Sequence, residues 1–161
     1  MKALQLVKYG EIKDSLAFNE VSRPSIKGTD VLIEVKAAAI NPIDKLIILG
    51  NLQGMLPVPF PSTVAYDVSG IVVEKGAEVS DFEIGDLVYS RVPQEQMGTI
   101  AEYVAVNSAA VSKKPGNITF EEAASLPLAG LTAMQSLEYA GIKENDKVLI
   151  MEIAVDIAES A

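Results

Sequence analysis

The sequence contains no cysteine and no histidine among its 161 residues. The lack of cysteine excludes disulfide bonds and thiolate chemistry. Because zinc prefers nitrogen and sulfur ligands, the lack of both residue types argues against a structural or catalytic zinc site, and we expect no metal. The lack of histidine also removes the commonest general base at neutral pH.

Long apolar runs are missing as well. No run reaches the roughly 18–20 residues that a membrane span requires. The first residues, MKALQ, are typical of a strand and not of a signal peptide. The net charge of −9 disfavours nucleic acid or an anionic membrane as a partner. These absences predict a cytoplasmic protein without nucleic-acid or membrane partners.

The chain does have enough apolar sequence for a folded core. Hydrophobic residues make up 49% of it and charged residues 22%, which is not typical of a disordered protein. A length of 161 residues favours one domain, or one domain and a fragment of another.

Short runs of strand-forming residues fill the first two thirds of the chain. These runs predict strands at residues 2–8, 15–21, 31–40, 67–73, 86–92 and 99–106. Turn signals recur roughly every ten residues, which favours a small barrel-like β fold over a parallel sheet. A short helix over 42–49 and a proline-rich loop at 55–62 interrupt the strands.

The pattern becomes helical after residue 115. Thr119, with Glu122 three residues later, predicts a capping box at the start of a short helix. A second helix should follow Pro127 and stop at Gly141. Residues 147–150, KVLI, predict one more strand.

Five stretches of the chain together resemble one known family. They are AAAINPID from Ala37, DVSGIV from Asp67, FEIGDLVY from Phe82, GTIAEYV from Gly98 and FEEAASLPLAGLTA from Phe120. In this order they resemble the zinc-independent quinone oxidoreductase branch of the medium-chain dehydrogenase/reductase superfamily. The resemblance implies reduction of quinones or enones by NADPH in the complete enzyme, and a homo-oligomer.

The resemblance also specifies the fold class. It implies a mainly β protein with short helices, in which a GroES-like, partly open β-barrel is followed by a helix and the first strand of a truncated Rossmann domain. The implied domains are a catalytic domain at 1–126 and, at 127–161, a linking helix, the remnant strand and an atypical tail.

Four residues are candidates for the site, and each has a structural alternative. Asn41 either ends a strand or lines the nicotinamide pocket, where its amide can form hydrogen bonds. Asp44 either stabilises the first turn of its helix, through the interaction of its negative charge with the helix dipole, or belongs to the cofactor site. Thr132 either bonds back to its own helix or lies near the nicotinamide. Tyr66 either donates a hydrogen bond in catalysis or packs against substrate rings.

The zinc-dependent relatives sharpen this assignment. They have a ligand cysteine at the position of Asn41 and a ligand histidine at that of Tyr66, and neither residue here is a good zinc ligand. The resemblance therefore implies direct hydride transfer, with the carbonyl polarised by hydrogen bonds.

The sequence also departs from the family pattern. Ala65 stands where many relatives have glycine, so a positive φ there would be strained. On the predicted helix, Leu46 stands two residues after Asp44, where many relatives have lysine or tyrosine, which weakens the case for a catalytic side chain there.

The tail at 151–161 is the largest departure. It contains no glycine and three acidic residues where the family has a phosphate-binding turn. The family also implies a dinucleotide-binding domain that is missing from this sequence, so we expect poor NADPH binding and negligible turnover by this chain alone. The alternative is a non-catalytic GroES-like module that self-associates or docks a partner through an exposed surface between domains.

Overall fold

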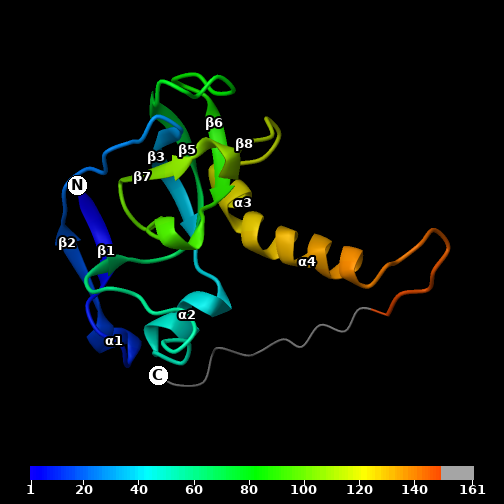
Figure 1. The fold of residues 1–161 in the computed structure, drawn as a ribbon, viewed down its shortest axis with the longest axis horizontal. Helices are drawn as coiled ribbons and strands as arrows, with labels where there is room; N and C mark the ends of the chain where they lie inside the picture. Colours follow the sequence, from blue (N-terminus) through cyan, green and yellow to red (C-terminus); the bar gives the residue numbers. More distant parts are fainter. Residues whose placement is uncertain (150–161) are drawn as a thin grey trace.

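The computed structural model describes residues 1–149, and its body consists of two antiparallel sheets. Figure 1 shows these sheets and their connecting loops as a rounded unit from which one long helix projects. The first sheet has the strand order β2-β1-β4, with bounds β1 Lys2–Leu6, β2 Leu16–Glu20 and β4 Ser62–Thr63. The helix α1, Ile12–Ser15, connects β1 to β2. The strands predicted at 2–8 and 15–21 therefore form, and they pair with each other as an antiparallel hairpin.

The second sheet is larger and holds the site. Its strand order is β7-β3-β5-β6-β8, with bounds β3 Asp30–Ala39, β5 Asp67–Lys75, β6 Leu87–Arg91, β7 Tyr103–Asn107 and β8 Val111–Lys113. Every neighbouring pair is antiparallel. The expected mainly β fold with a partly open barrel is confirmed, since the two sheets remain separate.

The segment at 99–106 does not form the single strand that its pattern predicts. Only β7 joins the second sheet, because the preceding residues bond to the first one. The N–H of Leu4 donates to the carbonyl of Ile100 at 2.9 Å, and Ala3 and Ala101 form an isolated bridge. The segment therefore crosses between the sheets, as the corner of a barrel does.

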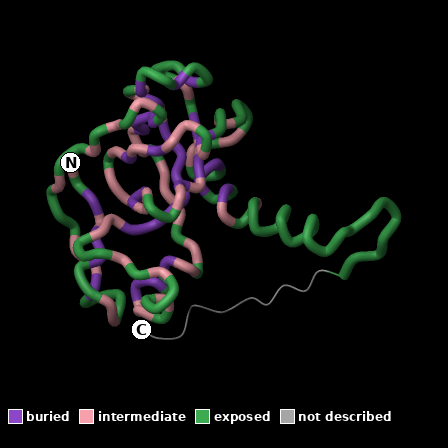
Figure 2. The backbone as a smooth tube through the Cα atoms, viewed as in Figure 1, coloured by how far each residue is buried: buried purple, intermediate pink, exposed green. Residues whose placement is uncertain are grey.

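The core lies between the sheets and is built mainly from β-branched side chains, which suit pleated strands. Its buried members are Leu6, Val31, Ile33, Ile47, Ile48, Val64, Tyr66, Val68, Val72, Val79, Phe82, Val88, Val92, Val104, Val106 and Val111. In Figure 2 the buried positions concentrate along these strands.

Ala65 adopts the positive φ that its place in the sequence suggested, at 74°. The loop between the sheets holds it there, because its carbonyl accepts hydrogen bonds from the N–H groups of Gly98 and Thr99 at 3.0 and 3.4 Å. A left-handed alanine is less stable than glycine by about 1–2 kcal/mol. The strained residue directly precedes Tyr66 and Asp67, and so fixes where β5 begins.

Three more α-helices complete the described chain. The helix α2 Pro42–Ile48 contacts α1, whereas α3 Phe120–Ser125 and α4 Pro127–Tyr139 contact the second sheet. The capping box of Thr119 and Glu122 is present, with bonds of 3.2 and 2.7 Å. Gly141 has φ 63° directly after α4, as the predicted helix stop requires.

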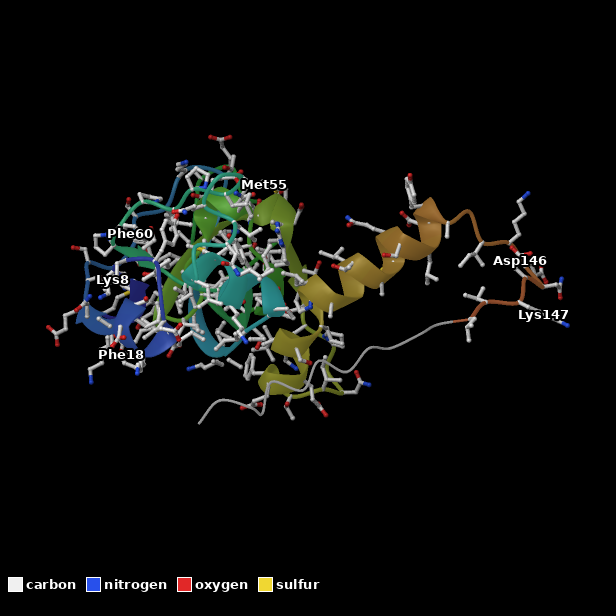
Figure 3. The ribbon with its side chains drawn as sticks, turned by 90° about the horizontal axis from the view of Figure 1, so that it is seen from below. Lys8, Phe18, Met55, Phe60, Asp146 and Lys147 are labelled. Atoms are coloured by element: carbon white, nitrogen blue, oxygen red, sulfur yellow. The ribbon has the colours of Figure 1, made fainter. Side chains whose placement is uncertain are left out.

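The second half of α4 projects from the body. Its residues from 131 to 140 are all exposed, including Met134 and Tyr139 at 60% and 97%. Figure 2 shows this arm as exposed nearly throughout, and in Figure 3 Asp146 and Lys147 lie at its end, far from Lys8 and Phe18. No helix within residues 1–149 is both long and apolar enough to span a membrane.

The strand predicted at 147–150 is not formed in 147–149, and Ile150 lies outside the described residues. Strands need a neighbour for their N–H and C=O groups, and no described segment pairs with this one. The acidic tail at 151–161 also lies outside the described residues.

Candidate active site

Asn41 lies at the junction of β3 and α2. It caps α2 in extended conformation, and Pro42 occupies the first helical position, where no N–H is needed. The carboxylate of Asp44 accepts the backbone N–H of Asn41 at 2.7 Å. Asp44 is 4% exposed, so its side chain faces inward and holds the start of the helix. The structural alternative for Asp44 is thus present in the fold.

Asp67 joins three elements of the site. It begins β5 and is fully buried. Its Oδ2 accepts the side-chain amide of Asn41 at 3.0 Å and the backbone N–H of Leu128, in the first turn of α4, at 3.1 Å. One carboxylate oxygen therefore fixes the Asn41 amide and the start of α4 relative to β5.

The two buried carboxylates have perturbed acidities. Burial raises the pKa of Asp67, while the Asn41 amide, the Leu128 N–H and the charge of Arg91 oppose this shift. Burial also raises the pKa of Asp44, opposed by the Asn41 N–H and reinforced by the charge of Asp67. Among residues 1–149, the buried Oδ1 atom of each has no hydrogen-bond partner.

This arrangement predicts how Asp44 affects stability with pH. Because its pKa is raised in the folded state, the folded protein binds a proton more readily than the unfolded chain. The group therefore stabilises the fold as pH falls through the folded pKa, fully so below the ordinary value of 3.8. As the pH is lowered from about 7 to about 4, the unfolding free energy of wild type, measured in urea, should increase relative to that of Asp44→Asn.

Asp81→Asn is the matched control, since it removes the same charge from an exposed position. Its stability difference from wild type should not follow the Asp44 profile. An Asp44→Asn difference that stays flat with pH would contradict the raised pKa.

A cleft of about 320 Å³ lies between α2, the end of β6 and α4. Its lining residues are Ile43, Arg91, Leu128, Leu131, Thr132 and Gln135. Two helices thus supply apolar walls, and polar groups come from Arg91 and one face of α4. Apolar walls with a few polar groups are typical of small-molecule sites.

Thr132 reaches this cleft from the exposed side of α4. Its hydroxyl donates to the Leu128 carbonyl at 2.8 Å, which is the back-bond that the sequence offered as an alternative. The hydroxyl oxygen can still accept a hydrogen bond from a ligand.

Tyr66 lies elsewhere. It is 2% exposed and contributes to a second cavity of about 490 Å³, between the proline-rich loop at 57–59 and residues 94–97. The Arg91 guanidinium lies 5.3 Å from the centre of its ring. Burial raises the pKa of its hydroxyl, as does the charge of Asp44, and Arg91 opposes them. Tyr66 and Thr132 therefore line different cavities, with Arg91 between them.

Sequence reasoning did not assign Asp67 or Arg91 to the site. Asp67 heads the DVSGIV motif, so its burial at a strand start could have been suspected. Nothing in the local sequence marks Arg91, whose importance depends on the pairing of β5 with β6, where it lies opposite Asp67. In the described part of the chain, no group of three or more acidic side chains could hold a metal ion.

Comparison with known proteins agrees with this architecture. Residues 27–116 match the alcohol dehydrogenase GroES-like domain. A 2-methylene-furan-3-one reductase of Solanum lycopersicum is 38% identical over 157 residues, covering 94% of this chain and 40% of the relative. A chloroplastic quinone-oxidoreductase homolog of Spinacia oleracea is 38% identical over 144 residues, covering 89% and 44%.

Solved structures give the same result. The quinone oxidoreductase of Coxiella burnetii has a TM-score of 0.80 and 35% identity, over 91% of this chain and 47% of that one. The Escherichia coli quinone oxidoreductase, solved with NADPH, has a TM-score of 0.78 and 26% identity, over 87% and 41%. The chain spans less than half the length of these relatives. It belongs to the alcohol dehydrogenase GroES-like family, in the quinone oxidoreductase branch of the medium-chain dehydrogenase/reductase superfamily.

Proposed function

We propose that this chain forms the GroES-like side of the active site in an NADPH-dependent reductase of quinones or enones that works without zinc. The observation that carries the proposal is the link through Asp67, which joins the Asn41 amide to the first turn of α4, where Leu128 lines one small cleft. The tomato and spinach relatives, a 2-methylene-furan-3-one reductase and a quinone-oxidoreductase homolog, support the substrate class.

The cleft fits a nicotinamide ring. Apolar contacts from Ile43, Leu128 and Leu131 suit the faces of a flat ring, and the Thr132 hydroxyl can accept a hydrogen bond from its carboxamide. We assign the Asn41 amide to the same ligand, since Asp67 fixes its orientation. NADPH, when bound, supplies a hydride, and the residues of this chain orient the ring that carries it.

We also propose a division of the chain into two parts. Residues 1–126 would form the catalytic domain, and α4 would link it to the nucleotide-binding part of the enzyme. Without a metal, the substrate carbonyl would be polarised by hydrogen-bond donors that face the cleft.

Cofactor titration tests the proposal. We expect the chain alone to bind NADPH weakly, so that high concentrations of NADPH are needed to raise the melting temperature of the chain or to change the fluorescence of the cofactor. Asn41→Ala and Thr132→Val should each weaken binding about tenfold, because each removes one hydrogen-bonding group.

The control for this titration is Asn117→Ala, which alters an exposed amide in the turn before α3 and should bind NADPH like wild type. Equal affinities of all three variants and wild type would contradict the assignment of Asn41 and Thr132.

A second candidate function is an interaction module, which the exposed apolar residues of α4 favour. Leu131, Met134 and Leu137 are 46–60% exposed in the described structure, and such surfaces are typical of contact sites. Saturable NADPH binding at micromolar concentration would contradict this candidate. Binding that is absent even at millimolar concentration, with a solution mass above that of one chain, would favour it over the reductase.

A further inference from the structure

Arg91 is a half-buried cation that forms no ion pair within the described residues. The chain has only two arginines. Arg23 forms an ion pair with Glu74 at 2.9 Å, whereas none of the ion pairs among residues 1–149 includes Arg91. Arg91 is half-buried and faces the cleft beside Thr132 and Gln135. Its guanidinium has five N–H donors, none of which is used in an ion pair within the described structure.

Neighbouring groups hold Arg91 in place. It ends β6 directly opposite Asp67 on β5, and its guanidinium lies over the Tyr66 ring. The paired backbone of β6 fixes the position of the Arg91 Cα atom, and contact with the Tyr66 ring restricts the conformations of the Arg91 side chain. The guanidinium is thus a positioned donor at the edge of the apolar cleft.

We infer that Arg91 forms an oxyanion-binding site with the polar face of α4, and that in the proposed reductase it is a catalytic residue that binds the carbonyl oxygen of an enone. The inference rests on the proposed function for the identity of the substrate. The anion site itself does not depend on it.

Reduction of an enone creates negative charge on its carbonyl oxygen. Hydride from NADPH adds to the β-carbon of the enone, the C=C π pair moves toward the carbonyl, and negative charge develops on the oxygen of an enolate. A proton from water then reaches the α-carbon, which gives the saturated ketone and NADP⁺. A positioned guanidinium stabilises the enolate oxygen more than the neutral carbonyl, as catalysis requires.

The charge of the protein favours a substrate that is neutral before reaction. The net charge of −9 repels permanent anions from the surface. The negative charge of Asp67, close to Arg91, also disfavours a permanent anion at this position. An enone is neutral on entry and becomes negative only inside the cleft, beside the guanidinium and the N-terminal turn of α4, which favours negative charge.

The test uses 4-nitrophenol, whose delocalised aryl oxide resembles an enolate. Titrated with the chain at constant neutral pH, the dye should become more ionised and its absorbance should rise to saturation. We expect Arg91→Met and Arg91→Gln to weaken binding of the phenolate at least about tenfold. Arg91→Lys should retain part of it, because lysine keeps the charge and loses the planar fork.

Arg23→Met is the matched control, since it removes the other arginine and should bind the dye like wild type. The methyl ether 4-nitroanisole, which has no ionisable oxygen, should show no dependence on Arg91. Circular dichroism checks the fold of each variant.

The outcomes are decisive in each direction. No saturable ionisation by wild type, or equal binding by wild type and both neutral Arg91 variants, overturns the oxyanion site. If the dye binds through Arg91 and the chain binds no NADPH, the oxyanion site stands and the proposed reductase function fails.

Discussion

Gly70→Ala should destabilise the protein by about 3 kcal/mol or more, a large effect for one methyl group. Gly70 lies in β5, the central strand of the larger sheet, between Val35 on β3 and Val88 on β6. A Cβ at this position would overlap the carbonyl oxygen of Glu34 and lie 2.7 Å from Cγ2 of Ile33. A backbone carbonyl within a ladder cannot move aside without breaking the pairing of β3 and β5.

Urea unfolding measures this effect, with Gly130→Ala as the control. Gly130 lies within α4, and a Cβ there would meet no atom of the described residues within 4 Å. That variant should gain up to about 1 kcal/mol, because alanine is the better helix former. Similar stability of Gly70→Ala and wild type would show that β3 can shift to accommodate a methyl group.

The strand and helix pattern was largely predictable because local chemistry determines it. The strand-forming run of β3, the capping box at Thr119 and the glycine stop at 141 act within a few residues and were found correctly. The expected strain at Ala65 also appears, since a single residue must turn the chain before β5.

The errors arose where an element depends on distant partners. The 99–106 run splits because its first residues bond to β1 in the other sheet. β8, Val111–Lys113, was missed because three residues carry too little alternation, and its pairing with β6 stabilises it. Residues 147–149 have strand-like composition and no described neighbour to pair with.

The site was predictable only in part for the same reason. Asn41, Asp44, Tyr66 and Thr132 were selected by motif, yet they occupy different environments: a cap, a buried carboxylate, a core ring and an exposed helix face. Their connection is Asp67, which spans 26 and 61 residues to its partners. Sequence separation of that size conceals such contacts from any local pattern.

Asp67→Ala should therefore affect both stability and the proposed cofactor site. It leaves the Asn41 amide and the Leu128 N–H without their shared acceptor, and each unsatisfied group costs about 1–3 kcal/mol. Burial raises the pKa of the Asp67 carboxyl group, which shows that its charge is unfavourable there. Removing that charge therefore offsets part of the loss in stability. We expect a net loss of about 2–4 kcal/mol of unfolding free energy and NADPH binding about tenfold weaker.

Asp67→Asn separates the acceptor from the charge. An asparagine keeps one oxygen for Asn41 and Leu128, and its NH₂ replaces Oδ1, which has no partner in the described structure. This variant should lie within about 1 kcal/mol of wild type at neutral pH, because the desolvated charge is gone while the hydrogen bonds remain.

A double-mutant cycle shows whether Asp67 acts through Asn41. If the carboxylate serves the cofactor by fixing that amide, Asn41→Ala in the Asp67→Ala background should weaken NADPH binding no further than Asp67→Ala alone. Additive losses in affinity would mean that Asp67 supports the cleft by another route, through Leu128 and the start of α4. The hydrogen bond from Leu128 should contribute mainly to the free energy of unfolding, and the hydrogen bond from Asn41 mainly to the affinity for NADPH. Measuring both quantities therefore distinguishes the roles of the two hydrogen bonds that Oδ2 of Asp67 accepts.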